Sequence, residues 1–295
     1  MNNRALCYDL HCHSTASDGS LSPAALIERA IQHGVDVLAL TDHDALDGLP
    51  EAYSAINGQS LKLIPGVEIS VTWSGRVIHI LGLNIDPANV ILINGLQHLS
   101  VQRERRAELI GQRFAKIGIA DAEEGARALA GGNIVTRSHF AQFLVKQGIV
   151  SNFKSAFRRY LKQGRPAYVG SEWVQLEQAL EWIRLSGGQA VIAHPARYGL
   201  SGLKLLSLIE DFKAAGGVGL EVVSSSHNPA ENSRMGKLAN QLGLLASVGS
   251  DFHSPEQEWV ELGRVAALPN ECTPIWQTWL TDSRKKTAKP ELAIV

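Results

Sequence analysis

Short apolar runs that alternate with amphipathic helical stretches constrain this chain more than any other feature of its sequence. Seven runs rich in Val, Ile and Leu occur, at residues 5–10, 35–40, 61–69, 77–83, 189–193, 218–223 and 244–248. Between them, residues 23–32 and 230–241 have helical spacing, and Ser22 before Pro23 is a typical helix start. This alternation is typical of a parallel sheet with crossover helices. We therefore predict an α/β fold, a distorted barrel of the (β/α)7 type.

The alternation stops in the middle of the chain. Between about residues 93 and 168 no strand pattern is convincing, and helical patterns occupy 100–116 and 137–147. The chain of 295 residues is also longer than the about 250 residues usual for such a barrel. We predict that the barrel is formed by residues 1–95 and 170–295, and that residues 96–169 are an inserted helical subdomain.

Charge is distributed unevenly, although the formal net charge is only −1. Residues 101–170 hold 13 Lys and Arg against 5 Asp and Glu, and the rest of the chain holds 15 against 24. A basic helical segment is either an ordinary solvated surface or a surface that faces an anionic substrate. The predicted subdomain is therefore basic, and both interpretations are open at this point.

Cysteine usage and hydropathy exclude several classes of protein. The three cysteines, Cys7, Cys12 and Cys272, lack the spacing of a zinc site, so a metal would need imidazole and oxygen ligands. No stretch approaches the roughly 18 apolar residues of a membrane span, and no signal-peptide pattern is present. We expect a cytoplasmic protein that does not associate with membranes.

Histidines and carboxylates gather where the predicted strands end. His11 and His13 end the first strand and share one face, because side chains alternate along a strand. The other candidates, in chain order, are Asp18, His43, Glu68 at the end of the third strand, His79, His194, Asp251 and His253. Strand ends of a β/α barrel meet on one face, where active sites form. Buried carboxylates in such a cluster repel unless cations neutralise them, and this ligand set suits Mn²⁺, Zn²⁺ or Fe²⁺.

Six motifs make the family recognisable. DLHCHSTASDG, LTDHD, PGVEIS, HILG, AHPAR and GSDFH occur in this order over nearly the whole chain. Together they resemble the PHP-domain family, the polymerase and histidinol phosphatase group of metal-dependent phosphoesterases. The resemblance implies two or three divalent cations, of which we favour Mn²⁺. It implies a first metal on His11, His13, Glu68 and Asp251, a second shared by Glu68 with His79 and His194, and a third on Asp18, His43 and His253.

The chemistry of clustered metals predicts the mechanism. Water bound between two cations loses a proton near neutral pH, so hydroxide is the expected nucleophile on phosphorus. His253 and Asp251 are the candidates to relay a proton to the leaving oxygen.

The basic segment narrows the expected substrate. TRSHFA, which opens a helix at Thr136, and the following GRPAYV resemble a PHP subgroup that acts on nucleotides. That subgroup hydrolyses nucleoside 3',5'-bisphosphates to nucleoside 5'-monophosphates and also trims short 5'-phosphorylated RNA. The resemblance implies that one phosphate is cleaved at the metals. The other phosphate would be bound by Arg137, His139, Lys154 or Arg197. No obligate protein partner is evident.

Two alternatives stay open. A histidinol-phosphate phosphatase would share every metal ligand, but its cationic substrate would need acidic groups where the segment is basic. A nucleic-acid-binding protein without activity would explain the basic segment, but the chain has no recognition-helix or RNP motif and is nearly neutral.

Overall fold

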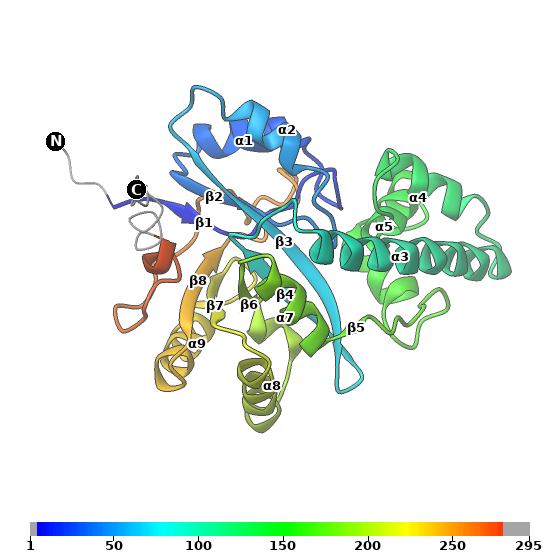
Figure 1. Cartoon of the computed structure of the whole chain (residues 1–295). Helices are drawn as coiled ribbons and strands as arrows, with labels where there is room; N and C mark the ends of the chain where they lie inside the picture. The colour runs from blue at the N-terminus through cyan, green and yellow to red at the C-terminus, as the bar shows by residue number, and fades with distance from the viewer. Residues whose placement is uncertain (1–4, 280–295) are drawn as a thin grey trace, which may run out of the picture.

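A barrel-shaped sheet and a helical insertion beside it make up the computed structural model, which describes residues 5–279 (Figure 1). The strands are β1 (Tyr8–Asp9), β2 (Val37–Leu40), β3 (Lys62–Trp73), β4 (Arg76–Leu83), β5 (Val174–Gln175), β6 (Gln189–Ile192), β7 (Gly219–Ser224) and β8 (Leu245–Gly249). Their order is β1-β2-β3-β4-β6-β7-β8, and β5 pairs with β3 outside this path. The strands of this path coincide with the seven predicted runs, so the α/β barrel is confirmed. Only the short strand β5 was not predicted.

Backbone hydrogen bonds bring the first and last strands of this order together. Leu10 N donates to Val248 O at 2.9 Å, and Asp251 N donates to His11 O at 2.8 Å. A parallel bridge between Cys12 and Phe252 extends the contact. The segments that follow β1 and β8 therefore lie side by side, and with them the ligand candidates that these segments carry.

The hairpin of β3 and β4 departs from the expected parallel sheet. β4 is antiparallel to both β3 and β6. Ser74 and Gly75 join β3 to β4 with φ values of 47° and 71°, and such a tight turn with two positive φ values reverses the chain. β3 also runs to Trp73, so the prediction that Glu68 closes this strand was wrong. Pairing with β4 continues the strand through Ser70 and Thr72, where the apolar run stops.

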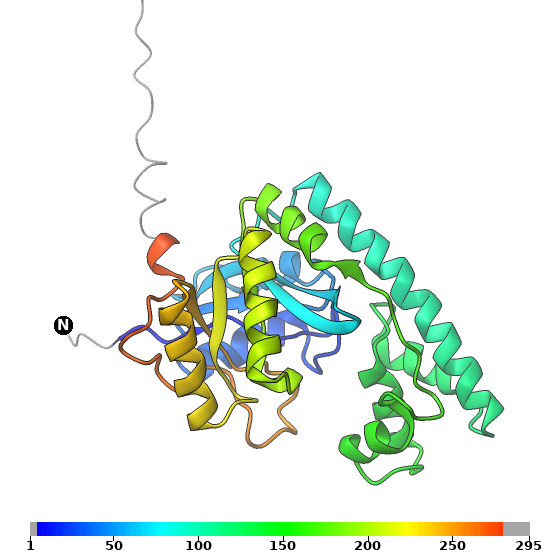
Figure 2. The same ribbon diagram turned by 90° about the horizontal axis from the view of Figure 1, so that it is seen from below.

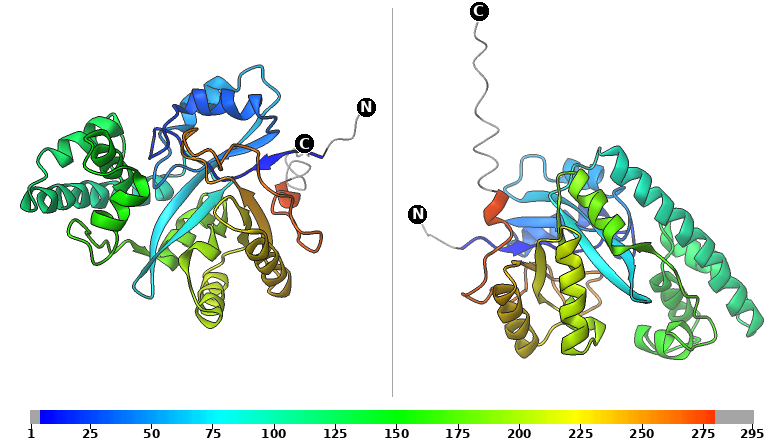
Figure 3. Two further views of the ribbon diagram at one scale, coloured as in Figure 1. Left: turned by 180° about the vertical axis from the view of Figure 1, so that it is seen from behind. Right: turned by 60° about the horizontal axis from the view of Figure 1, so that its bottom comes forward.

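Helices surround the barrel on its outer side, as the two views of Figure 3 show. They are α1 (Pro23–Gln32), α2 (Leu49–Ala55), α7 (Leu176–Leu185), α8 (Gly202–Ala214) and α9 (Pro229–Gln241), and the 3-10 turn η2 (Pro195–Tyr198) follows β6. The predicted start of α1 is confirmed, because the Ser22 side chain accepts a hydrogen bond from Ala25 N at 3.2 Å. Within residues 5–279 no helix combines the length and the apolar character that crossing a membrane requires.

The insertion is helical, as predicted. It contains α3 (Val90–Lys116), α4 (Ala122–Ala130), α5 (Arg137–Lys146), α6 (Phe153–Ala156) and the π-helical turn η1 (Phe157–Leu161). The long helix α3 extends away from the barrel, and the shorter helices fold back beside it (Figure 2).

The first helix of the insertion also belongs to the barrel. α3 begins at Val90 and not at Ser100, because Asn89 caps it by accepting hydrogen bonds from the next amides. Leu92, Leu96 and Leu99 pack in the barrel core. Ala107, Ile110 and Phe114 on the same helix pack in a separate core with α4 and α5. Because α3 is shared by both parts, the subdomain limits of 96 and 169 stay a prediction.

Candidate metal centre

All nine predicted metal ligands come together in one cluster. Their ligand atoms fall into four overlapping groups, within each of which they lie within 4.8 Å of one another. The groups are His13, Asp18, His43 and His253; His11, Glu68 and His194; His11, His13 and Asp251; and His43, Glu68 and His79. The convergence of strand ends that the sequence predicts therefore occurs. Which of these side chains hold which metal stays a proposal.

Glu68 lies at the middle of the cluster and is fully buried. Its Oε1 is 3.0 Å from both His79 Nδ1 and His194 Nε2, and its Oε2 is 2.8 Å from His43 Nδ1. Burial by itself would raise the pKa of Glu68, but the neighbouring histidines outweigh burial and hold the pKa well below its ordinary value. A carboxylate placed in this way would offer oxygen ligands to divalent cations.

His11 and His13 follow β1 and bring their imidazole rings together, as predicted. His11 Nε2 lies 3.1 Å from His13 Nε2, and Asp251 Oδ1 is 3.4 Å from the same His13 atom. Cys12 points the other way, and its thiol donates to Ala39 O at 3.2 Å. Burial and the nearby charge of His253 lower the pKa of His13 to about 3, so His13 presents a neutral imidazole.

Asp18 and His253 form the outer part of the cluster. His253 Nε2 lies 3.4 Å from Asp18 Oδ1, and His253 Nδ1 lies 2.8 Å from the backbone oxygen of Asp251. Burial opposes the charged form of His253, but the Asp18 and Asp251 carboxylates outweigh it and raise its pKa to about 9. By contrast, burial lowers the pKa of His79 to about 4. The cluster therefore contains imidazoles of very different basicity.

Unsatisfied polar atoms indicate what the cluster binds. Among the described residues, half of the ten buried side-chain atoms without a hydrogen-bond partner belong to it: His13 Nδ1, Asp18 Oδ1, His43 Nδ1, Glu68 Oε2 and His194 Nδ1. The His43 and Glu68 atoms are close but not aligned to bond each other. Buried groups in native proteins are normally paired, and imidazole and carboxylate ligands gathered within 4.8 Å of one another fit divalent cations.

Glu221 supports the cluster and was not predicted. It lies on β7 and is fully buried. Its Oε1 is 2.9 Å from His11 Nδ1, and its Oε2 accepts a hydrogen bond from the backbone amide of His194 at 2.5 Å. A carboxylate that holds the far nitrogen of a ligating histidine fixes the orientation of the ring. The only sequence signal was an acidic residue inside the apolar run 218–223.

Asp42 and Asp44, which flank His43, were also missed. Asp42 accepts hydrogen bonds from Ser14 N and from the hydroxyls of Ser14 and Ser17, all at 2.7 Å, and thereby holds the loop that leads to Asp18. Asp44 accepts from Arg103 Nε at 2.8 Å and from Arg103 Nη2 at 2.5 Å. Arg103 belongs to α3, so this buried ion pair ties the insertion to the segment that carries His43.

The insertion touches the cluster at the start of α5. Thr136 caps this helix, as predicted, and its hydroxyl donates to Asp18 Oδ2 at 3.2 Å. His139 accepts a hydrogen bond from Thr136 N through Nδ1, so that nitrogen completes the cap. Asn133 Nδ2 donates to Thr15 O at 2.9 Å. Residues 133–139 thus stand directly beside the loop that carries Asp18.

The four predicted substrate-binding residues have different surroundings. Arg137 is half-buried, with its guanidinium 5.8 Å from the Phe157 ring. Arg197 Nη1 donates to Asp251 Oδ2 at 2.9 Å, and Lys154 is exposed on α6. His139 is buried in its capping role. Their contact with substrate stays a prediction.

A buried histidine and carboxylate cluster at the strand ends of an α/β barrel defines a metal-dependent hydrolase. Comparison with known proteins identifies the family to which this hydrolase belongs. The PHP domain model matches residues 9–189, and the chain belongs to the PHP-domain family. The predicted resemblance is confirmed.

Relatives and a solved structure resemble the chain over nearly its full length. A 5'-3' exoribonuclease from Haemophilus influenzae is 47% identical over 92% of this chain and 98% of its own. A 3',5'-nucleoside bisphosphate phosphatase from Chromobacterium violaceum is 43% identical over 91% and 95%. The structure of an amidohydrolase from Chromobacterium violaceum, with bound sulfate and no metal, has a TM-score of 0.89 at 42% identity, over 93% and 96%.

Proposed function

We propose that this protein removes the 3'-phosphate from nucleoside 3',5'-bisphosphates to give nucleoside 5'-monophosphates, and that it also trims short 5'-phosphorylated RNA from the 5' end. The observation that carries this proposal is the contact between the basic insertion and the metal-binding cluster, through Thr136 and Asp18. An anion held by the insertion would lie beside the cluster. The phosphatase and exoribonuclease activities named for the relatives at 43% and 47% identity support the same substrate class.

The metal assignment carries over from the family motifs. One metal would be held by His11, His13, Glu68 and Asp251, a second by Glu68, His79 and His194, and a third by Asp18, His43 and His253. Asp18, His43 and His253 fall in one group of ligand atoms together with His13, and His11, His13 and Asp251 form another, whereas His79 and His194 fall in different groups, each with Glu68. Two or three divalent cations, of which we favour Mn²⁺, would supply an activated water and neutralise the phosphoryl oxygens.

The protein's own residues complete the reaction. His253 is the first candidate to relay a proton to the leaving oxygen, because it lies at the outer part of the cluster and its side chain is more exposed than that of Asp251. Asp251 is the second candidate, and it is also held by Arg197. The proposed contacts to the phosphate that is not cleaved are Arg137, His139, Lys154 and Arg197. The cytoplasmic location and the absence of an obligate protein partner stay predictions.

Phosphate release by the Mn²⁺-loaded protein tests this function. Adenosine 3',5'-bisphosphate, histidinol phosphate and a short 5'-phosphorylated RNA are offered in parallel, and the nucleotide products are identified by chromatography. The proposal predicts rapid release from the bisphosphate with adenosine 5'-monophosphate as the product. Release from histidinol phosphate alone, or adenosine 3'-monophosphate as the product, would contradict it.

A further inference from the structure

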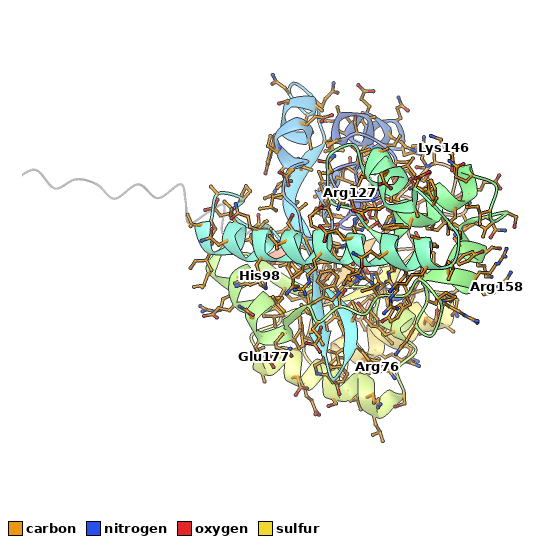
Figure 4. All side chains as sticks on the ribbon, turned by 90° about the vertical axis from the view of Figure 1, so that its right-hand side faces the viewer. Arg76, His98, Arg127, Lys146, Arg158 and Glu177 are labelled. Atoms are coloured by element: carbon orange, nitrogen blue, oxygen red, sulfur yellow. The ribbon has the colours of Figure 1, made fainter. Side chains whose placement is uncertain are left out.

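The hairpin of β3 and β4 carries two proposed metal ligands and extends past the end of β6. Glu68 lies on β3 and His79 lies on β4. The tip of the hairpin is exposed, and Arg76, three residues before His79, lies at this tip (Figure 4). β5 pairs with β3 beside the tip. β6 ends at Ile192, so its ladder with β4 stops just before His79 is reached.

Tyr198 binds β4 where the ladder with β6 stops. In an antiparallel pair, two opposed residues can exchange both of their backbone hydrogen bonds. Ala193 N donates to His79 O at 3.1 Å, whereas His79 N donates to the Tyr198 hydroxyl at 2.8 Å. The same hydroxyl lies 3.4 Å from His79 O, to which it donates. Tyr198 therefore fixes the backbone of β4 at the residue that carries a proposed ligand.

The turn that ends in Tyr198 also begins at a proposed ligand. His194 has a φ of 29° and immediately precedes η2, of which Tyr198 is the last residue. A residue other than glycine keeps such a backbone conformation only where its surroundings hold it. Glu221 holds the amide of His194, and the Tyr198 ring lies edge-on to the His194 ring with 5.4 Å between the ring centres. One side chain thus connects the backbone of His79 to the turn of His194.

We propose that Tyr198 is a positioning residue for the second metal, the one assigned to Glu68, His79 and His194. This inference rests on the metal assignment in the proposed function. Glu68 Oε1 lies 3.0 Å from His79 Nδ1 and 3.0 Å from His194 Nε2, although the two histidines come from different strands. Residues that fix the orientation of metal ligands contribute to metal affinity without touching the metal. Without the hydroxyl, the two histidines are no longer tied together, and the metal that they share is lost first.

Three variants separate this role from a general effect on the fold. Tyr198→Phe removes the hydroxyl and keeps the ring, which packs against the barrel core. Tyr160→Phe makes the same change at another half-buried tyrosine, which packs beside Phe114 in the core of the insertion. His79→Ala removes a proposed ligand and identifies the binding step that belongs to the second metal. Circular dichroism of the metal-free proteins shows that each variant folds.

Titration of the metal-free full-length protein with Mn²⁺, followed by the electron paramagnetic resonance of free Mn²⁺, gives a Kd for each binding step. We expect Tyr198→Phe to raise Kd about 10-fold at the step that His79→Ala abolishes, and less than about 2-fold at the other steps. Tyr160→Phe should change every step less than about 2-fold. An unchanged Kd at the identified step, or an equal rise at every step, overturns the proposal, because a purely structural role would weaken all steps together.

Turnover provides a second readout. With adenosine 3',5'-bisphosphate, we expect the kcat of Tyr198→Phe to be about 10-fold low at limiting Mn²⁺ and to return to within about 2-fold of wild type at saturating Mn²⁺. KM should not change, because Tyr198 acts on the ligands and not on the substrate. A loss of kcat that excess Mn²⁺ does not restore would contradict the positioning role.

The two proposals can fail separately. If the wild-type protein releases no phosphate from the bisphosphate while Tyr198→Phe weakens the identified Mn²⁺ step, the proposed substrate is wrong and the role of Tyr198 stands. If the bisphosphate is hydrolysed rapidly while Tyr198→Phe binds Mn²⁺ as the wild type does, the role of Tyr198 alone is wrong. If His79→Ala weakens no step, the metal assignment is wrong, and the role of Tyr198 falls with it.

Discussion

The barrel gathers buried carboxylates, whereas the insertion beside it carries half-buried arginines. In the metal-binding cluster the carboxylates of Asp18, Glu68 and Asp251 lie close together, and bound metal cations would neutralise them. At the junction with α3 and α5, Arg106 and Arg137 remain without a carboxylate partner among residues 5–279. The barrel side therefore requires bound metal cations to balance its charge, and the insertion side requires a bound anion. A phosphate ester that is cleaved on one side and held by a second phosphate on the other satisfies both.

Removing a central carboxylate should produce the largest effect on the barrel side. We expect Glu68→Ala, and likewise Asp18→Ala, to lower kcat/KM at least about 10³-fold, since a metal-binding carboxylate is worth several kcal/mol in the transition state. Steady-state phosphate release measures the loss, and elemental analysis measures the bound metal. Glu177→Ala, at an exposed glutamate of α7, is the control. Full activity in either cluster variant would break the ligand assignment.

The ion pair that joins the two regions should dominate stability. Arg103→Met leaves Asp44 buried and unpaired, and we expect it to lower the free energy of unfolding by about 3–5 kcal/mol. Asp44→Asn should act similarly, and the double variant should cost less than the sum of the two. Urea unfolding measures all three. The partly exposed pair Arg127–Glu104 is the comparison, and Glu104→Gln should cost under about 1 kcal/mol. Equal losses in the free energy of unfolding at the two ion pairs would show that Arg103 does not join the insertion to the barrel.

Glu221 tests metal binding by the barrel separately from substrate binding. It contacts the proposed metal ligands His11 and His194 and not the substrate. Glu221→Gln keeps the shape of the side chain but removes the charge that faces His11. We expect the affinity for Mn²⁺ to fall about 10- to 100-fold, as for other partners of metal ligands. Titration of the metal-free protein with Mn²⁺ measures this. Glu210→Gln, at an exposed position of α8, is the control, and an equal change there would remove the proposed role of Glu221.

The smallest effects are expected on the insertion side, where they should depend on the substrate. We expect Arg137→Ala to raise the KM for the bisphosphate about 10-fold more than the KM for p-nitrophenyl phosphate, which has no second phosphate. Lys154→Ala should show the same preference more weakly, because Lys154 is exposed. Parallel steady-state kinetics on both substrates decide the matter. Equal effects on the two substrates would exclude these side chains from phosphate recognition.

The difference between the barrel and the insertion also explains which residues the sequence could predict. The barrel ligands follow buried strands, and a polar group directly after an apolar run stands out and falls on a known face. His11, His43, His194 and Asp251 were predictable in this way, and the structure brings them together. Glu221 was not, because it lies within an apolar run and its role depends on its contact with His11.

The insertion offered less to sequence analysis. Arg103, Arg105 and Arg106 are nearly consecutive and look alike in the sequence. Only the packing of α3 distinguishes them: Arg103 is buried against Asp44, Arg105 is exposed, and Arg106 lies against Trp173. The start of α3 was also misplaced, because the strongest helical pattern begins only after Leu99, where the polar face becomes charged. Helical periodicity indicates faces, but not which neighbour covers each face.

We propose that this enzyme binds one phosphate with its insertion and cleaves another at its barrel. The most direct test is the ratio of kcat/KM for adenosine 3',5'-bisphosphate to that for adenosine 3'-monophosphate, measured with the Mn²⁺-loaded wild-type protein. We predict a ratio of at least about 100, because the second phosphate adds charge-assisted hydrogen bonds to arginine. A ratio near one would contradict the account, since the insertion would then contribute nothing to recognition of the substrate.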